Sequence, residues 1–204
     1  SRVSAAGAGD KPIVLADFSD NPGGGSYGDS PALLKQMVEA GLQNAAFAVI
    51  SDPEVAAAAV KAGEGAEISM PLGGKFDPSV TPAFDMTGTV TKISPEGRFV
   101  FEGPMMKGVE AVMGPSAVIK IGGVETVVIT NRFQPYDRMF FVHFGVIPEE
   151  KSVVAVKSAQ HFHAAYGPMA REVILVDAAG ITSPDPKKFP YQNVRRPIWP
   201  LDWH

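Results

Sequence analysis

The sequence predicts an α/β fold, with a mixed, largely parallel sheet, flanking helices and an inserted antiparallel β subdomain. Short runs that are apolar throughout are typical of strands buried on both faces, and they alternate with segments of helical period in residues 12–65 and 137–177. Between these regions, residues 66–131 are rich in β-branched side chains and Gly/Pro turns and lack helix signals. Alternating strands and helices favour parallel pairing, so the middle region is expected to be an insertion into the α/β layer.

The first elements are expected to form a βαβα unit. Each helix of this unit should begin at a polar cap followed by proline, with Asp29 or Ser30 before Pro31 and Asp52 before Pro53. In order, the predicted elements are a strand over 12–17, a loop over 18–28, a helix from 31 to a C-cap at 41, a strand over 44–50 and a helix over 53–62.

The β-rich region is expected to be an antiparallel sheet or partial barrel. Gly122-Gly123 lies between two β-branched runs and is typical of a two-residue hairpin turn. Strands are predicted over 67–72, 84–93, 98–101, 117–121 and 124–130. The α/β alternation then returns, with a short helix over 137–144, a strand over 153–157, a helix over 159–166 and a strand over 173–177.

The domain organisation predicted from these patterns is simple. Residues 1–11 are small and polar and indicate a linker, and residues 12–204 form one domain that includes the inserted region. Its last segment, 183–204, is rich in proline, which favours an extended strap over the surface rather than regular structure.

Composition excludes several classes of function. The 18 Lys and Arg against 22 Asp and Glu give a formal net charge of −4, which excludes broad nucleic-acid binding through a basic face. The chain has no cysteine, so disulfides, thiolate zinc sites and a cysteine nucleophile are excluded. The sequence has no apolar stretch long enough to span a bilayer and no apolar core of a signal peptide. We therefore expect a cytoplasmic protein without a nucleic-acid or membrane partner.

The loop after the first strand is the best candidate for chemistry. Asp20 and Asn21 follow the strand, where a carboxylate could act as a general base, and as an exposed loop carboxylate Asp20 would contribute little to stability. Gly23, Gly24 and Gly25 would let backbone N–H groups approach an anion or the oxyanion of a substrate. The same residues also make a good tight turn, so both interpretations remain open.

A second candidate lies where the strand over 153–157 passes into a predicted helix. Lys157 would present an ammonium to the same crevice, and His161 would lie in the first turn of the helix. Ser158 would cap the helix and is a candidate for binding an anion or the substrate. Because parallel strands bring their carboxyl ends together, Lys157 or His161 should lie within about 10 Å of the 20–25 loop. His161 and His163 point in different directions on a helix, so no metal site is assigned to them.

Weaker candidates follow the strand over 124–130. Arg132, Gln134 and Asp137 could line a pocket, or they could be a solvated loop. A complete hydrolase that uses Ser158 as its nucleophile is disfavoured, because no G-x-S-x-G elbow surrounds that serine.

The candidate motifs together resemble a known family. They are the segments 20–25 with 28–30, 157–158 with 161–162, and 195–202, and in this order they are similar to the carboxy-terminal domain of the microcystinase C (MlrC-like) family of candidate zinc metallopeptidases. The resemblance covers about Pro12 to Asp202. Tyr27 and His163 depart from the residues that the resemblance leads us to expect, so substrate contacts could differ.

The resemblance implies a half-enzyme. Zinc, the expected cofactor, would be held by an amino-terminal domain of the same protein, with no metal ligand from this chain. This chain would complete the active site for a peptide or amide substrate, such as a cyclic-peptide toxin. Asp20, Asn21, Lys157 and His161 would then have catalytic roles, and the isolated chain would be inactive. The alternative is a non-catalytic module that binds an anion or mediates oligomerisation, and self-association is left open.

Overall fold

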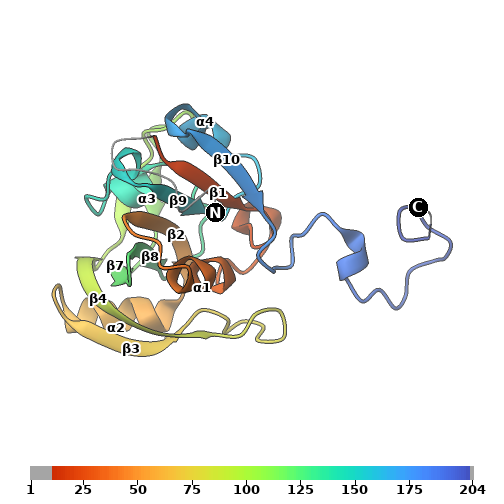
Figure 1. The fold of residues 1–204 in the computed structure, drawn as a ribbon, viewed down its shortest axis with the longest axis horizontal. Coiled ribbons are helices and arrows are strands. Elements are labelled where there is room, and N and C mark those ends of the chain that lie inside the picture. The colour runs from red at the N-terminus through yellow and green to blue at the C-terminus, as the bar shows by residue number, and fades with distance from the viewer. Residues whose placement is uncertain (1–10, 203–204) are drawn as a thin grey trace.

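The computed structural model describes residues 11–202, so most of the predicted linker lies outside the described residues. Its centre is an eight-stranded sheet of order β10-β1-β9-β2-β8-β7-β4-β3, and β5 and β6 form a separate two-stranded sheet (Figure 1). The strands are β1 Ile13–Asp17, β2 Ala45–Ser51, β3 Glu67–Leu72, β4 Phe84–Ser94, β5 Arg98–Val100, β6 Glu110–Val112, β7 Ser116–Ile121, β8 Val124–Ile129, β9 Val153–Val156 and β10 Glu172–Val176.

The strand pairing confirms the predicted fold class. β10, β1, β9, β2 and β8 pair in parallel, whereas β8, β7, β4 and β3 pair antiparallel. Most of the inserted β-rich region therefore continues the central sheet, because β8 pairs with β2, and only β5 and β6 leave it. The short strand β6 was not predicted.

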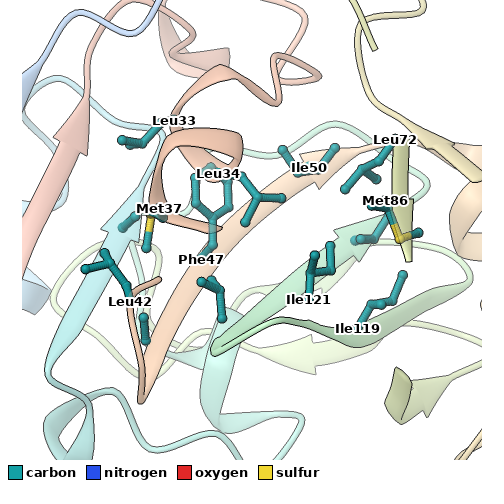
Figure 2. Close-up of a cluster of buried hydrophobic side chains, with 14 of the residues drawn as sticks. Leu33, Leu34, Met37, Leu42, Phe47, Ile50, Leu72, Met86, Ile119 and Ile121 are labelled. Atoms are coloured by element: carbon teal, nitrogen blue, oxygen red, sulfur yellow. The ribbon is translucent and has the colours of Figure 1, made fainter. Parts of the chain in front are cut away.

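The parallel strands are buried on both faces because helices cover both sides of the sheet. Ile13 and Leu15 of β1 join a cluster under helices α1 and α2, whereas Val14 and Ala16 join a second cluster under α3, α4 and the β5–β6 pair. Figure 2 shows side chains of the first cluster gathered between α1 and the sheet. The helices are α1 Ala32–Glu39, α2 Pro53–Ala62, α3 Met139–Val142 and α4 His163–Tyr166.

The predicted helix starts are only partly correct. Asp52 caps α2 and accepts a hydrogen bond from the backbone N–H of Val55 at 3.1 Å, as predicted. The N-cap of α1 is Pro31, without a side-chain cap. The Asp29 carboxylate instead accepts hydrogen bonds from the backbone N–H groups of Lys75 and Phe76, which anchors the loop after β3.

The helix predicted over 159–166 is much shorter than expected. It is reduced to α4, whose N-cap is Phe162, so His161 precedes the helix and Ser158 does not cap it. Within residues 11–202, no helix is both long and apolar enough to cross a bilayer.

The described part of the proline-rich segment, residues 183–202, is irregular apart from a single 3-10 turn at Pro186–Lys188. In Figure 1 this blue segment leads away from the sheet and its helices. Phe189 and Tyr191 still line a cavity of the domain. Beyond them, the expected strap does not lie over the domain in this view.

Candidate functional site

The candidate site lies at the carboxyl edge of the parallel strands. Asp20 follows β1, Gln134 follows β8, and Lys157 directly follows β9. These strands run parallel in the central sheet, so their carboxyl ends share one edge. Lys157 Nζ donates a hydrogen bond to Asp20 Oδ2, which confirms the expected proximity of the two segments.

Asp20 and Lys157 form a buried ion pair. Asp20 is 2% exposed and Lys157 is fully buried at 0%. Asp20 Oδ1 accepts hydrogen bonds from Ser26 Oγ at 2.5 Å and Gly28 N at 2.9 Å, and Oδ2 accepts one from Ser30 N at 2.8 Å. Lys157 Nζ also donates to Ser30 O at 2.6 Å. The pair therefore ties the whole 20–30 loop to the end of β9.

This burial corrects the view of Asp20 as an exposed loop carboxylate. Its oxygens are occupied by donors from the loop and by Lys157, so neither member of the pair is exposed to a substrate in this structure. The expectation that Asp20 contributes little to stability rested on an exposed carboxylate, and that premise is wrong because Asp20 is buried against its partner. The geometry favours a positioning role for both residues.

The electrostatics of the two neighbouring carboxylates differ. Burial opposes ionisation of Asp20, but the Lys157 ammonium and the hydrogen bonds outweigh it, so the pKa of Asp20 lies below its usual value. Burial raises the pKa of Asp17, against the opposing attraction of Lys157 and the hydrogen bonds from Ser19. Asp17 Oδ1 accepts both of those Ser19 bonds, whereas its buried Oδ2 has no hydrogen-bond partner among the described residues.

The glycine loop is ordered by its own hydrogen bonds. Asn21 Oδ1 accepts from Gly23 N at 3.0 Å, and Asn21 O accepts from Gly24 N at 2.9 Å and Ser26 N at 3.2 Å. Gly25 N donates to the carbonyl oxygen of Pro22 at 3.1 Å. These N–H groups are therefore already paired, and in this conformation none of them is free to bind an anion. The three glycines themselves are exposed.

Gln134 joins the loop to the segment after β9. Its Nε2 donates to Ser158 Oγ at 2.7 Å, and its Oε1 lies 3.0 Å from His161 Nδ1. A Cβ atom on Gly23 would lie 2.0 Å from Gln134 Oε1, so any larger residue at this position would force the Gln134 amide to shift. Gln134 and Ser158 are buried, whereas His161 is exposed. His161 thus lies near the glycine loop as expected, and the Gln134 amide forms the contact between them.

Sequence reasoning gave Gln134 no role beyond lining a pocket. The available signal was its place after β8, whose carboxyl end lies on the same edge as those of β1 and β9. Of the other weak candidates, Arg132 Nη1 donates to the backbone oxygen of Ser26 at 3.1 Å. Asp137 hydrogen-bonds to the backbone N–H groups of Gly103 and Met139.

A cavity of about 730 Å³ adjoins the glycine loop. Asn21 and Gly24 line it from the loop, Gln160 from the segment after β9, and Leu175 from β10. Within the described part of the chain its lining is mainly apolar and aromatic and contains no charged side chain. Its volume is typical of a ligand pocket, and its composition suits an uncharged group.

The described residues do not form a metal centre by themselves. Among residues 11–202, no group of at least three His, Cys, Asp or Glu side chains could hold a metal ion. His161 Nδ1 is paired with Gln134, and the His163 ring stacks on Phe162 with a centroid distance of 4.1 Å.

Comparison with known proteins assigns the chain to a family. The family model described as the MlrC C-terminus matches residues 15–193. Microcystinase C of Sphingomonas sp. is 32% identical over 191 residues, which are 94% of this chain and 36% of that protein. A crystal structure of a candidate metallopeptidase from Mesorhizobium sp. BNC1 superposes with a TM-score of 0.86 at 30% identity, over 100% of this chain and 40% of the other.

The chain thus spans well under half the length of both relatives. The match covers the whole α/β domain described above, including the loop after β1, the segment after β8 that holds Gln134, and the segment after β9. The agreement of the family model, the sequence relative and the solved structure confirms the resemblance seen in the motifs. This chain belongs to the MlrC C-terminal domain family.

Proposed function

We propose that this chain is the carboxy-terminal part of a metal-dependent peptidase or amide hydrolase. The supporting observation is the ordered sheet edge at which the buried Asp20–Lys157 pair holds the glycine loop and Gln134 holds the exposed His161. A site that is fixed in this way favours catalysis, because positioned groups need little reorganisation during a reaction.

The exposed groups and the buried groups have different roles in this proposal. His161 is the side chain that contacts substrate or the water that attacks it, since imidazole exchanges protons near neutral pH. Asp20, Lys157 and Ser158 position the loop and the His161 segment from below the surface. The adjoining cavity accepts an uncharged part of the substrate.

The metal belongs to another part of the full-length protein in this proposal. Family membership supports a metal-dependent reaction, and the metal that we propose is zinc held by an amino-terminal domain. When bound there, zinc would polarise the scissile carbonyl and lower the pKa of a bound water. The substrate class, a peptide or amide, is proposed from the name of the Sphingomonas relative.

The rival function, an anion-binding or oligomerisation module, has less support. An anion site in the glycine loop needs free N–H groups, and those of Gly23, Gly24 and Gly25 are paired within the loop. The cavity beside the loop has no charged lining residue that would attract an anion.

The proposal is tested by comparing the full-length protein with the 204-residue chain. We expect the full-length protein to hydrolyse linear peptide amides, to lose this activity on dialysis against a chelator, and to regain it with added zinc. The isolated chain should show no turnover and retain no stoichiometric metal after dialysis, because a catalytic zinc site needs about three protein ligands. Chelator-resistant hydrolysis by the full-length protein, or metal-dependent turnover by the isolated chain, would contradict the proposal.

A further inference from the structure

Gln134 connects three segments that are distant in the sequence. Its side-chain amide lies against Gly23 after β1, Ser158 directly after Lys157, and His161 three residues further on. Gln134 is 7% exposed, so its amide is largely removed from water. A buried amide is held firmly by its protein partners, because each unpaired polar atom would cost free energy.

The contact with Gly23 favours one orientation of the Gln134 amide, in which Oε1 faces the glycine loop and His161. The Cα–H bond of Gly23 is directed at the atom assigned as Oε1, because a Cβ built in that direction would lie 2.0 Å from it. A weak C–H donor there favours an oxygen over an NH₂ group. The Nε2 group then donates to Ser158 Oγ at 2.7 Å, and that hydroxyl is a suitable acceptor.

The orientation of the amide determines the protonation of the histidine. Gln134 Oε1 can only accept a hydrogen bond, so the 3.0 Å contact requires a proton on His161 Nδ1. In the neutral ring the other nitrogen, Nε2, is then an acceptor. Among the described residues, no group hydrogen-bonds to His161 Nε2.

We infer that Gln134 is a positioning residue that holds His161 as the Nδ1–H tautomer, with Nε2 as an exposed hydrogen-bond acceptor at the carboxyl edge of the sheet. The ligand that Nε2 recognises is therefore a donor, such as a water molecule or the N–H group of an amide. The identification of that donor as substrate rests on the proposed function, but the tautomer does not.

The inference also gives a physical reason for glycine at position 23. An alanine there would displace Gln134 Oε1 and break the contact with His161. Among residues 11–202 no side chain forms such a hydrogen bond with His163, which stacks on Phe162 instead, so it provides an internal comparison within the same protein.

Ring-nitrogen NMR of the ¹⁵N-histidine-labelled 204-residue chain tests this inference, at a pH where the imidazoles are neutral. We expect His161 in the unsubstituted chain to be mainly the Nδ1–H tautomer. Gln134→Met removes the acceptor and should shift the tautomer ratio by about fivefold towards Nε2–H, the effect of losing one ordinary hydrogen bond. Gln134→Glu keeps an acceptor oxygen and should retain the Nδ1–H form.

The controls separate positioning from general damage to the fold. The His163 signals should be unchanged in both variants, and Gln36→Met, at an exposed glutamine of α1 that bonds to Glu39, should leave His161 unchanged. An Nε2–H tautomer in the unsubstituted chain would overturn the inference without any variant. An unchanged ratio in a folded Gln134→Met chain would overturn it as well. The expected tautomer together with an inactive full-length protein would leave the inference intact and refute the proposed function.

Discussion

Replacement of Lys157 by methionine is expected to lower the free energy of unfolding by about 3–5 kcal/mol, the usual cost of breaking a buried ion pair from one side. Methionine fills a similar volume, so the cost arises mainly from the Asp20 carboxylate, which is left buried without its cation. Urea denaturation of the 204-residue chain at pH 7 measures the difference.

Two comparisons make this prediction specific. Lys35→Met removes an exposed pair with Glu39 and should change stability by less than about 1 kcal/mol. Adding Asp20→Asn to Lys157→Met removes the unpaired charge and should recover part of the loss. If Lys157→Met lowered the free energy of unfolding no more than Lys35→Met does, the buried pair would not hold the 20–30 loop in place.

The dependence of stability on pH follows from the same pair. The pKa of Asp20 in the folded chain lies below its unfolded value of about 3.9. The contribution of the ionised Asp20 to the free energy of unfolding is therefore fully present above that pH. The contribution is lost as the pH falls from there towards the lowered folded value. In Lys157→Met this loss on the acid side should become smaller, because the neighbouring cation is gone.

Replacement of His161 by alanine is expected to lower kcat of the full-length protein by ~10²-fold, the scale of losing one proton-transferring group. Its effect on stability should be small, because the ring is exposed and its hydrogen bond to Gln134 is a single ordinary one. Steady-state hydrolysis of a linear peptide amide and thermal unfolding of the same preparation give the two quantities.

His163→Ala is the matched control, since His163 is also exposed and lies two residues further along the chain. This substitution should leave kcat within about twofold of the value for the unsubstituted full-length protein, as expected for a surface side chain that does not contact the substrate. Equal losses for both histidines would show that the segment at the start of α4 matters only for folding. An unchanged kcat in His161→Ala would remove His161 from the proposed mechanism.

The parts of the site that were predictable depend on strand topology. The apolar runs of β1 and β9 indicate strands buried on both faces, and parallel strands end at a common edge. These two observations were enough to predict that Lys157 lies close to Asp20, although 137 positions separate them in the sequence. The N-cap of α2 was predictable for a local reason, because Asp52 bonds within its own first turn.

The parts that were not predictable depend on partners from other segments. The sequence does not show that Asp20 is buried, because its donors come from its own loop and from the end of β9. Three consecutive glycines suggest free N–H groups, but Asn21 and Pro22 use these groups to close the turn. Ser158 Oγ accepts a hydrogen bond from Gln134 Nε2 and does not cap α4, a contact between distant segments that the sequence alone does not show.

In the function that we propose, the carboxyl edge formed by the glycine loop and His161 faces the metal centre of the full-length protein. Substitution of the metal by paramagnetic Co²⁺, followed by NMR of the labelled protein, tests it directly. We predict strong paramagnetic shifts or broadening for Gly23, Gly24, Gly25 and the His161 ring, and none for β3 at the far end of the sheet. Resonances of the loop and His161 that are unaffected by Co²⁺, or strongest effects at β3, would contradict the account.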